Sequence, residues 1–172
     1  MDFLMDTIRW GHIGFGFVGL AAFWVPIVAR KGGKNHRFYG KIFKYCAYVV
    51  LYAAMASVVL HLGDGLSSGV TPATNPSQYG FLFFLGYLAI VTLVGLRHGM
   101  QVLQRKKDIT TLNTSANRNM ARLSILASVA IIFYALYFKP SSMIVLLALS
   151  PVGFGTGFGV LKACLLYTSP SP

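Results

Sequence analysis

Residues 79–96 read YGFLFFLGYLAIVTLVGL, a run without a single charged side chain. An apolar run of this length is a candidate transmembrane helix, because about 20 helical residues cross the hydrocarbon core of a bilayer. Four similar runs lie on either side of it, and the five predicted spans cover about residues 10–29, 42–62, 79–96, 120–138 and 143–161. We therefore expect an all-α integral membrane helical bundle with five transmembrane helices.

The overall composition supports this class. Only 11% of the 172 residues are charged and 55% are hydrophobic, whereas a soluble domain carries about 25% charged residues. A water-soluble globule and a disordered tail are therefore excluded. The acidic residues are all aspartates, and none lies inside an apolar run; they are Asp2, Asp6, Asp64 and Asp108. The spans thus offer no carboxylate for a proton relay or a di-iron site.

Basic residues alternate between the loops and predict the topology. The first loop and its flank contain Arg30, Lys31, Lys34, Arg37, Lys41 and Lys44, and the third contains Arg97, Arg105, Lys106, Lys107, Arg118 and Arg122. The loop at 63–78 contains no Lys or Arg. By the positive-inside rule, we expect a multi-pass protein of a bacterial inner (plasma) membrane with its N-terminus outside. The net charge of +11 therefore does not indicate nucleic acid; the expected partners are the lipid bilayer and a second copy or another membrane protein.

The last nine residues have an unusual character. Residues 164–172 read CLLYTSPSP and look like translated sequencing adapter; the alternative is a polar Ser/Pro tail after the last helix. On the adapter interpretation, residues 1–163 form a single transmembrane helical domain of a C-terminally truncated fragment, and the tail is excluded from the fold. Cys46 is then the only cysteine, so no disulfide framework is expected and Cys46 is a small apolar packing residue.

The four histidines are the candidates for a functional site. His12 and His61 lie near the outer ends of the first and second spans, His36 lies in the first inner loop, and His98 lies near the inner end of the third span. Two layers of paired histidines are what a transmembrane carrier with two b-type haems requires, since neutral imidazole is a good axial ligand.

Two glycines extend this pattern along the first span. Gly16 and Gly19 share a helix face with His12 and would leave room for a flat macrocycle. The alternative is that the histidines are interfacial residues bonded to water, lipid or backbone, and that the glycines allow two helices to approach closely. Both interpretations stay open.

Other motifs predict packing or exclude chemistry. No helix carries two histidines at zinc-ligand spacing, so we expect neither a metal site nor a catalytic residue. The G-x-x-x-G pairs Gly153 with Gly157, and Gly155 with Gly159, favour close helix crossings. Pro151 predicts a kink in the fifth span.

Residues 12–43 read HIGFGFVGLAAFWVPIVARKGGKNHRFYGKIF. The pattern of a histidine, glycines, a basic loop and a His-Arg-x-x-Gly-Lys motif resembles the bacterial membrane proteins called domain of unknown function 2306. The matching positions are His12, Gly16, Lys31, Gly32, His36, Arg37, Gly40 and Lys41, and the resemblance is clearest over residues 10–62. It implies a multi-helix inner-membrane protein and no assigned activity.

The His-Arg-x-x-Gly motif has two physical interpretations. His36 and Arg37 would contact lipid phosphate or the third loop at the inner interface, while Gly40 brings the backbone close to a neighbour. Alternatively, His36 reaches back into the bundle as a ligand.

Three functions follow as hypotheses. The first is an integral membrane protein with a structural, lipid-binding or partner-binding role and no chemistry of its own. The second is a haem b-binding transmembrane electron carrier, and the third is a small transporter. The absence of acids from the spans disfavours the transporter.

Overall fold

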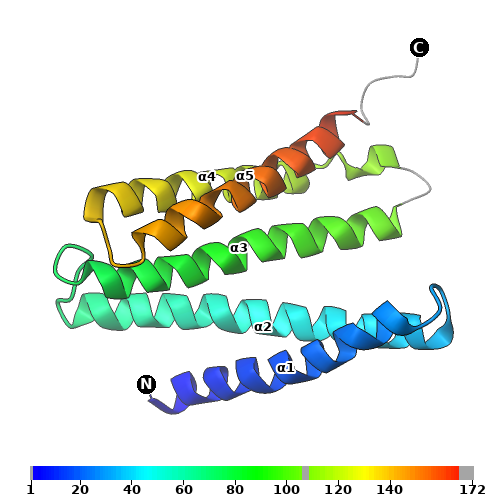
Figure 1. The fold of residues 1–172 in the computed structure, drawn as a ribbon, viewed down its shortest axis with the longest axis horizontal. Helices are drawn as coiled ribbons and strands as arrows, with labels where there is room; N and C mark the ends of the chain where they lie inside the picture. Colours follow the sequence, from blue (N-terminus) through cyan, green and yellow to red (C-terminus); the bar gives the residue numbers. More distant parts are fainter. Residues whose placement is uncertain (1, 106–108, 167–172) are drawn as a thin grey trace. The chain divides into compact units, whose positions relative to one another are not determined.

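Five long helices carry the apolar runs (Figure 1). The computed structural model describes residues 2–105 and 109–166. In chain order, the elements are α1 (Asp2–Val28), α2 (Lys34–Ser67), α3 (Pro76–Gln104), a short 3-10 helix η1 (Ile109–Leu112), α4 (Ser115–Phe138) and α5 (Met143–Leu166). The described residues contain no strand, so the prediction of an all-α fold is confirmed.

All five α-helices are long and apolar enough to cross a membrane, which confirms the prediction of a multi-pass membrane protein. The helices extend beyond the predicted spans because their polar flanks continue the same backbone ladder. In lipid, only an unbroken helix satisfies its own N–H and C=O groups, and each residue that continues the helix into the interface adds one backbone hydrogen bond.

The extension at the start of α2 corrects the expected position of His36. We expected this residue in a loop, but α2 begins at Lys34, so His36, Arg37 and Gly40 lie in the first turns of the helix. The helix begins early because the Arg37 N–H already donates to the Gly33 carbonyl at 3.1 Å. Gly32 makes the preceding turn at a φ of 78°, a left-handed conformation that favours glycine.

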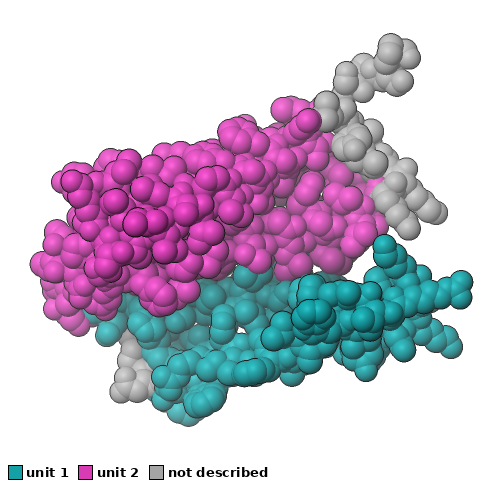
Figure 2. All heavy atoms as spheres, in the orientation of Figure 1, with its two compact units in different colours: residues 1–64 teal, residues 65–172 magenta. Residues whose placement is uncertain are grey.

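The chain divides into two compact units, residues 1–64 and 65–172, which are coloured separately in Figure 2. In the first unit, α1 approaches α2 closely at Gly19, where an added Cβ would lie 3.1 Å from the Cβ of Cys46. The rings of Phe23 and Phe43 meet one turn away, with centroids 5.4 Å apart. Cys46 is a buried, free cysteine, consistent with the packing role expected for it.

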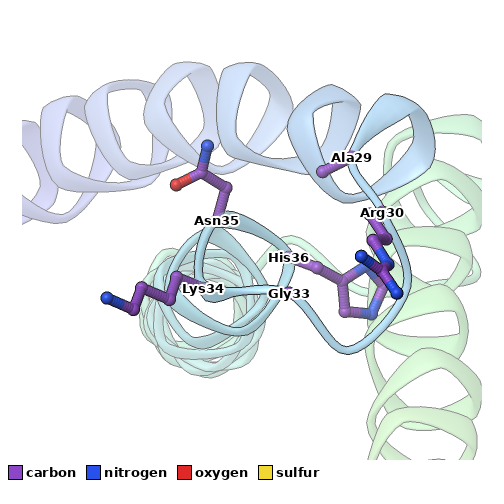
Figure 3. Close-up of a pocket in the computed structure, with 6 residues that line it drawn as sticks. All are labelled: Ala29, Arg30, Gly33, Lys34, Asn35 and His36. Atoms are coloured by element: carbon purple, nitrogen blue, oxygen red, sulfur yellow. The ribbon is translucent and has the colours of Figure 1, made fainter.

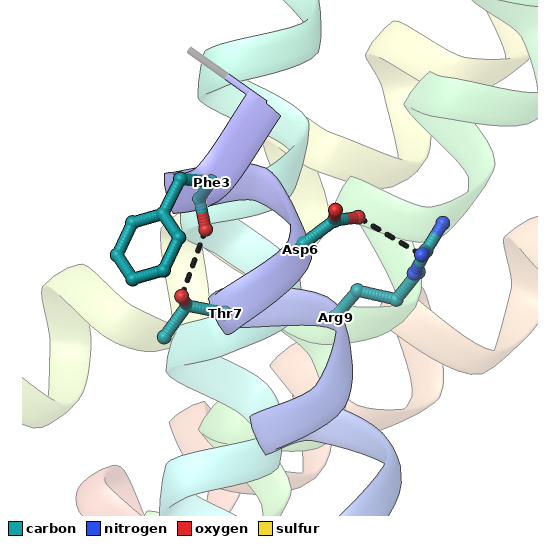
Figure 4. Close-up of polar contacts among 4 residues, drawn as sticks. All are labelled: Phe3, Asp6, Thr7 and Arg9. Atoms are coloured by element: carbon teal, nitrogen blue, oxygen red, sulfur yellow. Dashed lines mark hydrogen bonds and ion pairs between the residues drawn. The ribbon is translucent and has the colours of Figure 1, made fainter.

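The first turns of α1 carry exposed polar contacts (Figure 4). Asp6 pairs with Arg9 at 2.9 Å, and both side chains are more than half exposed. The Thr7 hydroxyl donates to the Phe3 carbonyl at 2.8 Å. An exposed ion pair of this kind contributes at most about 1 kcal/mol to the free energy of unfolding. It therefore adds little to the stability of the helix.

The second unit packs α3, α4 and α5 together. One cluster joins Val94 of α3, Ala121 of α4 and Val160 of α5. A Cβ added to Gly157 would lie 2.5 Å from Ile125 and 2.8 Å from the Ala121 carbonyl. Gly157 therefore lets the backbones of α4 and α5 approach closely, as the G-x-x-x-G pattern predicted.

Side-chain caps define the ends of the helices in this unit. Asn75 accepts from the Gln78 N–H at 3.2 Å to begin α3, and Thr114 accepts from the Asn117 N–H at 3.2 Å to begin α4. Lys139 ends α4 in a left-handed conformation with a φ of 46°.

The last helix, α5, continues through Cys164 to Leu166. Residues 167–172 of the expected adapter tail lie outside the described residues.

The two glycine stripes of α5 should differ in their tolerance of substitution. Gly157→Ala should lower the free energy of unfolding by about 1–3 kcal/mol, because the methyl group overpacks against a backbone carbonyl. Gly159→Ala should be neutral or slightly stabilising, since nothing described lies within 4 Å of an added Cβ there. Denaturant titration of both variants in the same micelles measures the difference. Equal stabilities would contradict the close crossing at Gly157.

Candidate functional site

The three histidines of the first unit share one arrangement. The Nδ1 atoms of His12 and His36 lie 3.1 Å from the carbonyl oxygens of Val50 and Pro26. The Nδ1 of His61 lies 2.8 Å from the carbonyl oxygen of Ser57, in its own helix. A carbonyl only accepts, so each Nδ1 carries the proton, and Nε2 of the neutral ring is left as an acceptor. Metal-bound histidines commonly have this arrangement.

His12 and His61 do not lie at one level of the α1–α2 hairpin. His12 contacts the backbone of α2 at Val50, and His61 lies three turns further along α2, or roughly 16 Å at 1.5 Å per residue. Because the two helices run in opposite directions, His61 is level with the first turn of α1. The expected outer layer, in which these two rings face one macrocycle, is therefore not formed.

His36 and His98 belong to different units, so their expected inner layer stays a prediction. His98 lies on the face of α3 that also carries Val91 and Val94. Its Nδ1 atom is buried without a hydrogen-bond partner among the described residues. Arg97 Nε and Gln101 Oε1 in the same turns are also unpaired there.

The glycines near His12 have different surroundings. Gly19 is buried at the close approach to Cys46, whereas an added Cβ at Gly16 or Gly40 would meet no described atom within 4 Å. Gly19 therefore serves helix packing. Gly16 leaves open space one turn from His12, and Gly40 does not mark a close backbone contact in the described chain.

A pocket lies at the turn between α1 and α2 (Figure 3). It has a volume of about 300 Å³ and is lined by Ala29, Arg30, Gly33, Lys34, Asn35 and His36. His36 is held there by the carbonyl of Pro26, near the end of α1. The Gly33 N–H closes the turn on the Arg30 carbonyl at 2.9 Å.

The charge of this pocket has one sign. Arg30 and Lys34 line it, and Lys31, Arg37 and Lys41 are exposed beside it. In the sequence, no acidic residue occurs between Asp6 and Asp64. The first N–H groups of α2 also point out of the helix at this end and add partial positive charge. The turn therefore presents donors and positive charge to an anion.

Sequence reasoning missed a second polar cluster, which lies inside the second unit. The single proton of the Tyr87 hydroxyl faces two acceptors, the carbonyl oxygens of Leu149 and Ser150, at 2.9 and 3.0 Å. Ser124 donates to the Gly153 carbonyl at 2.8 Å. The signal available in the sequence was a tyrosine and two serines inside apolar spans, but only the packing of α3, α4 and α5 brings them together.

No family model, curated protein or solved structure matches this chain. The resemblance to domain of unknown function 2306 therefore stays a prediction. In residues 2–105 and 109–166, no three His, Cys, Asp or Glu side chains lie close enough together to hold a metal ion.

The bond from His36 to Pro26 should hold the basic turn in place. His36→Ala removes the bond, and the turn should open to trypsin, with cleavage after Arg30 and Lys31 several times faster in lipid nanodiscs. His61→Ala is the matched control, because it removes a histidine–carbonyl bond confined to a single helix. If both variants are cleaved at the wild-type rate, His36 does not order the turn.

Proposed function

We propose that this chain is a multi-pass inner-membrane protein that binds the phosphate group of anionic lipids at the turn between α1 and α2. The N-terminus faces outside in this proposal, and the turn faces the cytoplasm. One observation carries it: the pocket lined by Arg30, Lys34 and His36, which lies between two membrane-spanning helices.

The position of the turn relative to the bilayer favours a lipid headgroup as the ligand. The turn joins the ends of two helices that are long and apolar enough to span the bilayer, so in this proposal its residues lie at the level of the headgroups. Each Lys or Arg near an anionic membrane surface contributes about 1 kcal/mol of attraction. No neighbouring carboxylate in the sequence competes for these cations.

The pocket also has the right donors for phosphate. A guanidinium such as that of Arg30 bonds two phosphate oxygens at once, and an ammonium such as that of Lys34 adds a compact charge. His36 contributes an imidazole whose ring position is set by the Pro26 carbonyl. Lys31, Arg37 and Lys41 outside the pocket raise the local concentration of anionic lipid without contacting the same phosphate.

Three variants that each remove one positive charge test this proposal. Arg30→Gln should lower the preference for phosphatidylglycerol over phosphatidylcholine more than tenfold, because it removes a hydrogen bond to a charged group, worth about 1.5–3 kcal/mol, as well as one charge. Lys31→Gln and Lys41→Gln, which remove the same charge outside the pocket, should lower it about fivefold, the factor for about 1 kcal/mol of attraction. Native mass spectrometry of protein from mixed-lipid nanodiscs counts the retained lipids. An equal loss in all three variants would indicate general electrostatic attraction, and no loss would contradict any lipid role.

A second candidate function is haem b binding, and the geometry at His12 favours it. The Val50 carbonyl holds Nδ1 and leaves Nε2 as the ligand atom, and Gly16 leaves open space in the next turn. His61 lies too far along α2 to be the opposing ligand, so a second ligand would come from elsewhere, including a second copy of the chain.

An optical spectrum tests the haem candidate. Protein expressed with haem supplied should show a b-type reduced-minus-oxidised spectrum, which should be lost or halved in His12→Ala because the axial nitrogen is gone. His61→Ala should keep the spectrum. A colourless wild-type protein with normal helical circular dichroism rules out this candidate.

A further inference from the structure

A proline interrupts the backbone ladder of α5, and side chains replace the missing donor. Pro151 has no N–H for the carbonyl of Leu147, four residues earlier. The Ser150 hydroxyl donates to this carbonyl instead, at 2.9 Å. The replacement is local to α5, and it leaves the helix continuous through the proline.

Two residues further on, a side chain of another helix contacts the backbone of α5. The Gly153 N–H donates to the Tyr87 hydroxyl at 2.8 Å, and the same hydroxyl lies 2.9 and 3.0 Å from the carbonyl oxygens of Leu149 and Ser150. Gly153 and Leu149 are the donor and acceptor of one turn of an α-helix. The hydroxyl of α3 therefore contacts both ends of the turn that contains the proline.

Serines of α4 hold the same turn from the other side. Ser124 donates to the Gly153 carbonyl at 2.8 Å, and the Ser128 oxygen lies 3.4 Å from the Tyr87 hydroxyl. A Cβ at Gly153 would lie 2.7 Å from the Tyr87 oxygen and would also overlap Ser128. The side chains thus reach the backbone of α5 only because residue 153 is a glycine.

We propose that α5 contains a hinge at Pro151–Gly153 that the Tyr87 hydroxyl latches. The two arms of the hinge are residues 143–150 and 154–166. With the hydroxyl in place, hydrogen bonds from α3 hold the turn in which the proline has removed a backbone bond. Without it, this weakened turn loses its support from α3 and bends, so the arms change their relative direction.

The other buried tyrosines of the unit provide a contrast. Tyr134 donates to the Pro76 carbonyl at the start of α3, and Tyr79 donates to the Val70 carbonyl in the preceding loop. Each of these bonds ties a helix to the start of a helix or to a loop, and neither involves α5. Tyr134→Phe is therefore a matched control for Tyr87→Phe, since it removes the same kind of bond without affecting α5.

Spin-label distances across the hinge test the latch in the full chain. Labels at Ile144→Cys and Lys162→Cys, both exposed, stand on opposite arms in a Cys46→Ala, Cys164→Ala background in nanodiscs. The wild-type distance should be narrowly distributed near 27 Å, from a rise of 1.5 Å per residue. Tyr87→Phe should broaden or shift it by several ångströms, and Tyr134→Phe should leave it unchanged.

Hydrogen exchange and a rescue variant complete the test. The Gly153 amide should exchange about tenfold faster in Tyr87→Phe, the factor expected for one lost buried hydrogen bond. Pro151→Ala restores the backbone donor and should narrow the distances again in the Tyr87→Phe protein. If Tyr87→Phe does not fold, Ser150→Ala, which keeps the Tyr87 hydroxyl, should leave the distances narrow, and broadened distances would show that the serine and not the tyrosine holds the turn. Unchanged distances and exchange in Tyr87→Phe, or a failed rescue, would overturn the proposal.

Discussion

Inside a bilayer no water satisfies a backbone N–H or C=O group, so every interruption of a helix needs a donor or acceptor from the protein. Two places in this chain show how that need is met. At the end of α1, where the last carbonyls lack a partner within the helix, the Pro26 carbonyl accepts from the imidazole of His36. In α5, the Ser150 hydroxyl donates to the carbonyl that Pro151 leaves without a donor, and the Tyr87 hydroxyl contacts the same turn. In each unit, the proposed site thus lies where a helix ends or is interrupted.

The distribution of charge follows from the same constraint. Because charges are costly in the hydrocarbon core, the cations gather at helix ends, and the turn after α1 becomes a concentrated positive surface. The tertiary structure adds a pocket to that surface by folding Arg30, Lys34 and His36 around the start of α2. The positive charge of the proposed lipid site follows from the position of the turn outside the hydrocarbon core. The pocket does not follow from that position, because it depends on how the turn folds.

Small residues decide where polar groups can reach the backbone. Gly153 admits the hydroxyls of Tyr87 and Ser128, and Gly157 admits the carbonyl of Ala121. The parallel stripe of Gly155 and Gly159 has the same spacing but meets no described atom. Spacing alone therefore marks a surface that is able to pack closely, and the position of the neighbouring helix decides whether it does.

Residue order was enough to identify five spanning helices, because apolar length and the cost of unsatisfied backbone act locally along the chain. It was not enough for the candidate site. His12 and His61 stand near the same predicted boundary in sequence, yet the register of α1 on α2 separates them by about three turns. Tyr87 and Gly153 share no sequence signal, and only the packing of α3 against α5 joins them. Contacts between helices are set by side-chain shape across distant segments, which no local pattern encodes.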